Sequence, residues 1–253
     1  MKLIKMPSIG QFNQTIKDIK HQAQYKETLE DGTVVMDRNA KLPTVEFTGT
    51  CKLHGSNASV CMNSNGELWA QSKGNIITPE KDNAGFAFFV ESNKEYFREK
   101  LQEMLNEFNL NEVCIYGEWA GKGIQKGVAI SELQKTFYAF GVKYQREKTK
   151  DYEWAQKPKV VLGHLSDGAR IRSIYEFETY SVSIDTNNPK EYLSKLIEIT
   201  DNIDKECPIG KELIQEKYGG KFEIINGKPN KDFSINILNN VKTLPDGEYT
   251  LWF

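Results

Sequence analysis

Apolar residues near the N-terminus recur every three or four positions, at Ile9, Phe12, Ile16 and Ile19. That spacing predicts an amphipathic helix over Ile9–Ala23, with Ser8 as its N-cap. Residues 25–41 are polar and rich in turn formers, and Asp31-Gly32 marks a turn there.

The middle of the chain alternates strand-like runs with one helical stripe. Short runs rich in β-branched and aromatic residues predict buried strands, and the stripe of apolar residues predicts a core-facing helix. The turn residues 63–66 predict that two of the strands form a hairpin. The predicted strands are Val45–Lys52, Ala58–Met62, Glu67–Gln71, Val113–Glu118 and Thr136–Val142, and the helix is Asn93–Phe108.

The second half is less regular. Lys143–Lys159 is highly charged, which predicts an exposed excursion, and Ile171–Ile184 is mixed. Pro189–Asp204 predicts a helix with Pro189 near its first turn. Lys221–Phe253 predicts short strands joined by turns at residues 226–227 and 246–247. Without a repeat or an obvious linker, the simplest organisation is one α+β domain over residues 1–253, with antiparallel sheets flanked by helices.

Composition narrows the class only slightly. The chain is 39% hydrophobic and 27% charged, as in ordinary globular proteins, and a formal net charge of −2 neither supports nor excludes a nucleic-acid partner. No apolar run is long enough for a membrane span or a signal peptide, so we expect a cytoplasmic protein. The four cysteines lack C-x-x-C spacing, and we expect neither a zinc site nor a disulfide framework but small buried hydrophobes.

The first candidate chemistry lies at Lys52, in the run Thr50-Cys51-Lys52-Leu53-His54-Gly55-Ser56-Asn57. A strand, a sharp turn and a second strand would hold this amine rigidly at the mouth of a sheet. A lysine becomes nucleophilic when its surroundings favour the neutral amine. Taken alone, K-x-x-G better fits a lysine that reaches solvent from a strand end.

Two later segments add to this picture. Glu118 ends a predicted strand just before the glycines of residues 121–123, and could accept hydrogen bonds from a sugar hydroxyl. Phe140 lies on an aromatic strand and could stack on a purine. Taken singly, the first also fits a solvated acid and the second a core residue.

In this order, the three segments resemble the covalent nucleotidyltransferases, and most closely the bacteriophage RNA ligase 2 family. K-x-H-G-[ST]-N at residues 52–57 is similar to the nucleophile motif of that family. Y-G-E-x-x-G-x-G-I-Q at 116–125 and F-Y-x-F at 137–140 resemble its next motifs, and Gln71-Ser72-Lys73 stands where a further element is found. The resemblance covers roughly residues 7–211 and implies the adenylation-domain fold of ligases, described as ATP-grasp-like.

The resemblance also implies a reaction, its cofactors and its partners. Lys52 would attack the α-phosphate of ATP in the presence of Mg²⁺, and the AMP would pass to an RNA 5′-phosphate before a 3′-hydroxyl seals the strand. His54 would lie near the leaving phosphates and Asn57 near the transferred phosphate, with Lys73 neutralising phosphate charge. Glu118 would hold the ribose and Phe140 would stack on adenine. The expected partners are RNA ends or nicks, and the expected state is a monomer.

The pattern departs from the family at three places. Lys73 replaces a common arginine and loses its bidentate fork, and Gly141 stands where many relatives have an acid. The strand E-G-x-V and the following K-x-K are not found. Glu248 is the best substitute for the acid, and lysines between 221 and 242 could partly replace the pair. We therefore expect slow self-adenylation and no C-terminal RNA-binding domain.

Two functional classes remain open at this point. The first is an ATP-dependent RNA ligase, or at least a self-adenylating domain, with a DNA ligase or capping-type enzyme as its rival. The second is a degenerate, non-catalytic module that binds nucleotide or RNA ends. Lys52, His54, Asn57 and Glu118 favour the first class, and the missing lysine pair favours the second.

Overall fold

The computed structural model describes residues 1–8, 10–82, 84–126, 128–147, 149–188, 191–205, 208–218, 224–225 and 228–229. The chain forms two compact units, which are treated separately below. The larger unit comprises Met1–Met6, Cys51–Glu178 and Asp204–Phe253, and the smaller comprises Pro7–Thr50 and Thr179–Ile203.

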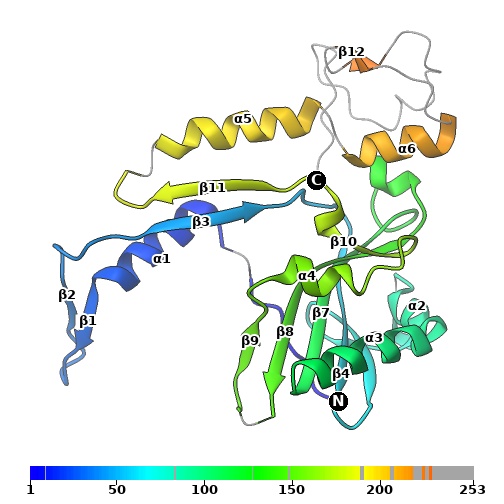
Figure 1. Ribbon diagram of the computed structural model, residues 1–253, viewed down its shortest axis with the longest axis horizontal. Coiled ribbons are helices and arrows are strands. Elements are labelled where there is room, and N and C mark those ends of the chain that lie inside the picture. The colour runs from blue at the N-terminus through cyan, green and yellow to red at the C-terminus, as the bar shows by residue number, and fades with distance from the viewer. Residues whose placement is uncertain are drawn as a thin grey trace. The chain divides into compact units, whose positions relative to one another are not determined.

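A seven-stranded sheet forms the centre of the larger unit (Figure 1). Its order is β10-β8-β7-β4-β5-β6, and β9 also pairs with β8. All neighbours are antiparallel except β10, which runs parallel to β8. The strands are β4 Ser56–Asn63, β5 Leu68–Ser72, β6 Ile76–Ile77, β7 Leu110–Ala120, β8 Thr136–Arg146, β9 Tyr152–Trp154 and β10 Ile171–Ser173.

The larger unit also contains helices and 3₁₀ turns. They are α2 Phe86–Ser92, α3 Lys94–Glu107, α4 Pro158–Gly163 and α6 Pro208–Tyr218, with three 3₁₀ turns at Pro79–Lys81, Ala129–Glu132 and Ile174–Glu176. The short pair β12 Ile224–Ile225 and β13 Lys228–Pro229 lies apart from the sheet in its own hairpin.

The two faces of the sheet are distinguished by strand alternation, because successive side chains point to opposite sides. Val60, Ile115 and Phe137 belong to the main apolar core, together with Phe97 and Leu101 of α3. The alternate residues of β4, β7 and β8 therefore lie on the opposite side, which we call the site face. On these strands it carries Asn57, Ser59, Cys61, Cys114, Tyr116, Glu118, Tyr138 and Phe140.

The N-terminal segment 1–6 crosses part of the site face. Ile4 and Met6 are buried there in a cluster with Trp69 and Tyr116. Backbone groups of Ile4 exchange hydrogen bonds with the Gln71 side chain, and the Tyr116 hydroxyl donates to the Ile4 carbonyl at 2.7 Å. These bonds satisfy buried polar groups and fix the segment on the sheet.

The cysteines depart from the sequence expectation. Cys61 and Cys114 are direct partners in the β4–β7 register, and their sulfurs form a disulfide. The prediction that these two residues are free hydrophobes is therefore wrong, because strand pairing, which their spacing does not reveal, places them opposite each other. Cys51 is a free, buried thiol, as expected.

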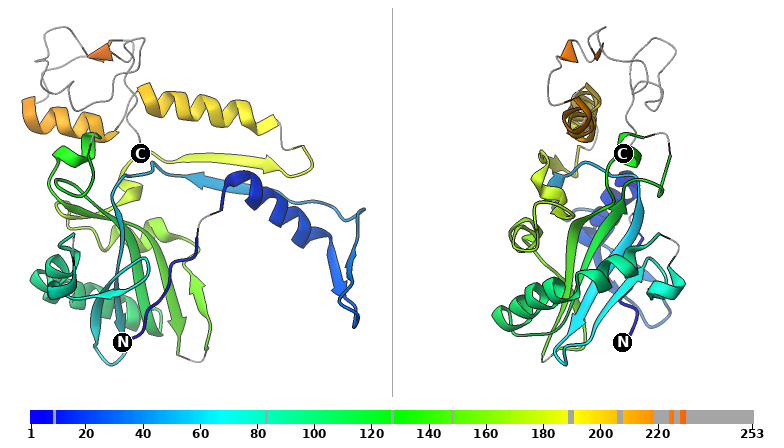
Figure 2. Two further views of the ribbon diagram at one scale, coloured as in Figure 1. Left: turned by 180° about the vertical axis from the view of Figure 1, so that it is seen from behind. Right: turned by 90° about the vertical axis from the view of Figure 1, so that its right-hand side faces the viewer.

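The smaller unit has a two-stranded ribbon of β3 Thr44–Gly49 and β11 Tyr180–Asp185. Its helices are α1 Phe12–Gln24 and α5 Glu191–Lys205, and a hairpin is formed by β1 Tyr25–Thr28 and β2 Val34–Met36. Figure 2 shows α1 alongside the ribbon. Residues of both helices pack with Phe47, Val182 and Ile184 in a small core.

Most predicted elements are found with shifted ends, and the α+β class with antiparallel sheets flanked by helices is confirmed. The predicted N-cap Ser8 is wrong, because α1 begins after Gln11, which makes no side-chain cap. The strand predicted over Val45–Lys52 ends at Gly49. The excursion Lys143–Lys159 is also wrong in part, since it holds the end of β8, all of β9 and the start of α4. Among the described residues, no helix is long and apolar enough to cross a membrane.

Candidate active site

Lys52 lies in the segment that joins β3 to β4. Its neighbours Cys51 and Leu53 are buried at 5% and 4% exposure, whereas Lys52 is exposed and His54 is half-buried. The two buried residues join an apolar cluster with Tyr138 and with Ile209 and Leu213 of α6. The segment is therefore anchored on both sides of Lys52, and its amine is presented outward from a fixed backbone.

Burial also controls the chemistry of Cys51 beside this lysine. Burial raises the pKa of the Cys51 thiol to about 11. A backbone hydrogen bond lowers this pKa in part, and the charge of Glu212 raises it further. The thiol stays protonated near neutral pH, and so it is a packing group rather than a competing nucleophile.

Gly55 connects the lysine segment to β7. A Cβ on this residue would lie 2.5 Å from the Trp119 carbonyl oxygen and 2.7 Å from the Ala120 Cβ, so only glycine fits. Its N–H donates to Glu118 Oε1 at 3.0 Å, and its carbonyl accepts from Gln125 Nε2 at 3.1 Å. The run 116–125 thus holds the turn after Lys52 from two sides.

Glu118 is the half-buried centre of the arrangement. In the register it lies between Asn57 of β4 and Tyr138 of β8. Burial raises the pKa of the Glu118 carboxyl, while the Gly55 N–H and the charge of Lys52 lower it in part. The bond from Gly55, three residues after Lys52, ties Glu118 to the segment that carries this lysine.

Asn57 offers an unused acceptor beside Glu118. Its Oδ1 is buried and has no hydrogen-bond partner among the described residues, while its Nδ2 donates to the Met6 sulfur at 3.7 Å. A buried amide oxygen without a partner is costly. A ligand that donates a hydrogen bond would relieve that cost, so the atom suits a binding position.

Aromatic residues continue the site face on β8. A bulge falls between Tyr116 and Gly117, so that Ala139 and Gly141 have partners in β7 whereas Phe140 has none. Phe140 is half-buried, packs against apolar clusters on either side, and accepts a bond at its carbonyl from the Tyr175 hydroxyl. Phe140 therefore lies on the same face as Glu118 and Asn57.

The other predicted site residues are less closely tied. Lys73 is exposed and follows Ser72, the partner of Ala58, so its backbone lies at the sheet end where β4 begins. His54 is half-buried in the Lys52 segment. Glu248 lies outside the described residues.

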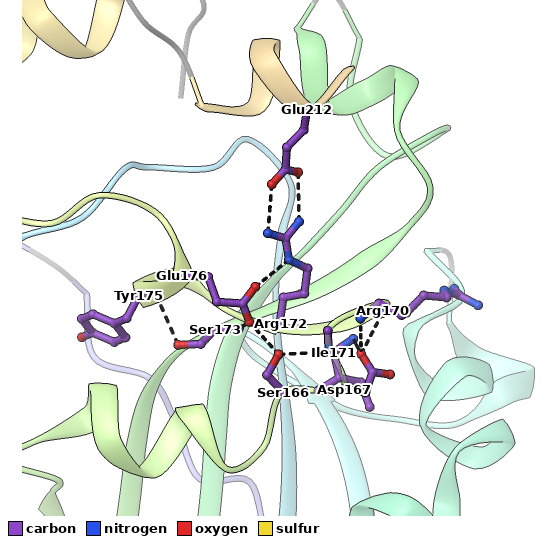
Figure 3. Close-up of polar contacts among 11 residues, drawn as sticks. Ser166, Asp167, Arg170, Ile171, Arg172, Ser173, Tyr175, Glu176 and Glu212 are labelled. Carbon is purple, nitrogen blue, oxygen red and sulfur yellow. Dashed lines mark hydrogen bonds and ion pairs between the residues drawn. The ribbon is translucent and has the colours of Figure 1, made fainter. Parts of the chain in front are cut away.

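One charged network was not foreseen from the sequence. Arg172 on β10 donates to both carboxylate oxygens of Glu212 on α6 at 2.9 Å, and its Nε donates to Glu176 (Figure 3). The guanidinium also lies 5.6 Å from the Tyr138 ring centroid. The network joins α6, which packs on the Lys52 segment, to the strand region beside Tyr138. No local pattern signalled the pair with Glu212, because it lies 40 residues from Arg172 in the chain.

The arrangement as a whole suits a nucleotide. It combines a half-buried carboxylate, an unpaired amide oxygen and aromatic rings on one sheet face with a lysine in the segment that leads into β4. Among the described residues there is no group of three or more His, Cys, Asp or Glu side chains that could hold a metal. A magnesium ion commonly binds through one or two carboxylates and the substrate phosphates, and Glu118 is a carboxylate bonded to the turn after Lys52.

Comparisons with known proteins found one family match and a similar solved structure. Residues 45–205, more than half of the chain, match the family model described as RNA ligase. A search among curated proteins finds no match. Among solved structures, the chain is similar to a mutant RNA ligase of Naegleria gruberi with AMP and manganese, at 18% identity and a TM-score of 0.39. The similarity covers 60% of this chain and 40% of that one.

Proposed function

The chain belongs to the RNA ligase family, and from that premise we propose that it is an ATP-dependent RNA ligase whose nucleophile is Lys52. The observation that carries the proposal is the pair of hydrogen bonds that Gly55 makes with Glu118 and Gln125. These bonds join the lysine segment to the acid segment. Both segments lie within the matched residues 45–205. The sequence motifs at residues 52–57, 116–125 and 137–140 favour an enzyme of the bacteriophage RNA ligase 2 kind.

In the proposed first step, the neutral Lys52 amine attacks the α-phosphorus of ATP. A nitrogen–phosphorus bond forms, the bond from that phosphorus to the bridging oxygen of pyrophosphate breaks, and the amine proton is released to solvent or to the leaving phosphates. The RNA 5′-phosphate then displaces the lysine, and the 3′-hydroxyl displaces AMP. The overall change is one phosphodiester bond formed for one ATP converted to AMP and pyrophosphate.

The other residues hold and orient the substrate in this proposal. Glu118 accepts hydrogen bonds from the ribose, and the free Oδ1 of Asn57 accepts one from the bound nucleotide. Phe140 stacks on adenine, while His54 and Lys73 lie toward the phosphates. Phosphoryl transfer depends mainly on positioning and charge stabilisation, and a segment anchored by Cys51 and Leu53 provides the first of these.

Magnesium would enter with the phosphates of ATP. The ion would neutralise charge on the leaving pyrophosphate. His54 and Lys73 supply the protein's own positive or hydrogen-bonding groups on that side.

Covalent labelling tests the nucleophile. We expect α-labelled ATP and Mg²⁺ to label the parent chain, and Lys52→Arg to abolish the label, because a guanidinium does not offer a neutral amine. A denaturing gel measures the result, with Lys81→Arg, an exposed lysine elsewhere, as the matched control. Strong labelling of Lys52→Arg would overturn the assignment, and absence of label in the parent would favour the non-catalytic binding module instead.

A further inference from the structure

Trp154 on β9 exposes an aromatic ring beside the candidate active site. Its side chain is 38% exposed, although the hairpin around it is strongly charged. Its ring centroid lies 5.3 Å from that of Tyr116, a residue of the site face. The indole is therefore backed by the sheet and open to solvent elsewhere.

Gly141 explains how the ring reaches this position. A Cβ at residue 141 would lie 3.2 Å from the indole Cζ3 of Trp154, closer than an ordinary van der Waals contact. The small residue directly after Phe140 thus leaves room for the indole.

Positive charge accompanies the ring. Lys143 is the direct strand partner of Trp154, and its Nζ lies 5.6 Å from the Trp154 ring centroid and 5.5 Å from that of Tyr152. Lys2 lies 4.9 Å from the Tyr152 centroid. No ion pair is found for Lys143 within the described parts of the chain, so its charge is available to a ligand.

Acidic groups nearby are already engaged. Glu112 pairs with Lys2 and accepts a short hydrogen bond from the Tyr152 hydroxyl. Glu153 accepts from Tyr144 and pairs with Arg146. The balance of charge around the exposed indole therefore favours an anion that also carries a ring.

We propose that Trp154 and Lys143 form a subsite that stacks a nucleobase of the RNA strand and contacts its phosphate. The proposal rests on the proposed function, because it assigns a place to the RNA rather than to ATP. Lys143 follows Phe140 by three positions along β8, or about 10 Å at the rise of a strand. A nucleotide that extends from Lys52 to Phe140 would not cover the Trp154 ring. That ring would remain open to stack a second base.

Binding of a short 5′-phosphorylated single-stranded RNA, without ATP, tests the subsite. Trp154→Ala should weaken binding about tenfold, since one base stacked on an aromatic ring contributes an effect of that order. Trp154→Phe should restore most of the affinity. Lys143→Ala should lower the salt dependence of binding by about 0.7 in the log–log slope, as one lost phosphate contact does.

The controls separate this proposal from the one it rests on. Phe88→Ala removes a ring that is 66% exposed on α2 and should leave RNA binding unchanged. Thermal unfolding checks that each variant folds, and Trp154→Leu replaces the alanine variant if that one does not. Unchanged RNA affinity in Trp154→Ala or Trp154→Leu, or a loss of ATP affinity in place of RNA affinity, would overturn the subsite. Self-labelling at Lys52 is measured separately and decides only the proposed function.

Discussion

In its proposed binding role, Glu118 would act at the expense of folding. Burial raises the pKa of its carboxyl, so the folded protein holds the proton more tightly than the unfolded chain does. The ionised form that binding needs is therefore disfavoured by folding at neutral pH, and this penalty disappears below the ordinary glutamate range, about pH 4.

Glu118→Gln should consequently raise the melting temperature at neutral pH while weakening ATP binding. The amide oxygen still accepts from Gly55, but the charge-assisted contact to a ribose is lost, for an expected loss of about fivefold to tenfold in affinity. Melting curves of parent and variant at neutral and acidic pH measure the first effect. The prediction is wrong if Glu118→Gln has a lower melting temperature than the parent at neutral pH and the difference between the two does not narrow in acid.

Gln125 donates one hydrogen bond to the carbonyl of Gly55, three residues after Lys52. Gln125→Ala should slow self-labelling about tenfold, because small displacements of a reacting group cost rate steeply. ATP affinity should stay near that of the parent, since Gln125 is not assigned a contact with nucleotide. Gln102→Ala, which removes an exposed bond on α3, is the control. Equal losses in rate and ATP affinity would mean that Gln125 binds the nucleotide instead.

At the scale of elements, α6 depends on Arg172 for its place against the sheet. Arg172→Met leaves Glu176 and Glu212 without their shared partner and should cost about 2 kcal/mol, in the range of hydrogen bonds to charged groups. Partial exposure, 33% for Glu212, argues against a larger cost. Thermal unfolding at neutral pH measures the loss, expected as several degrees.

The pH dependence of this loss follows from Glu176. Although burial opposes it, hydrogen bonds from Ser166, Ser173 and Arg172 lower the pKa of Glu176. A depressed folded pKa gives stability that is present near neutral pH and is lost as pH falls through that pKa. The gap between parent and Arg172→Met should therefore narrow in acid. Arg146→Met, which breaks an exposed pair with Glu153, should change stability by less than about 1 kcal/mol at any pH.

At the scale of the whole molecule, the sequence predicted most of the helices and strands, which depend on residues close together in the chain. The periodicity over 93–108 predicted α3, and the apolar runs predicted β4, β5, β7 and β8. The charged segment 143–159 was predicted as an exposed excursion. It contains β9, an edge strand in which Glu153 faces solvent while Tyr152 and Trp154 contact the sheet face.

The candidate site could be predicted only as separate pieces. The motif residues Lys52, Glu118 and Phe140 were identified from the chain, but the bonds of Gly55 span 63 and 70 positions and the Arg172–Glu212 pair spans 40. Such contacts depend on sheet register, which local patterns do not specify. The disulfide between Cys61 and Cys114 was missed for the same reason.

The smaller unit also constrains the order of events during synthesis. β3 finds its only described sheet partner in β11, and almost the whole larger sheet is encoded between them. On the ribosome, Phe47 and its neighbours must wait for Val182 and Ile184 to emerge before their core can form. Such distant pairing is slow to form, and apolar residues left waiting invite association with other chains. A chaperone that shields residues 44–49 during translation would thus raise the yield of folded protein more than one that acts on the completed chain.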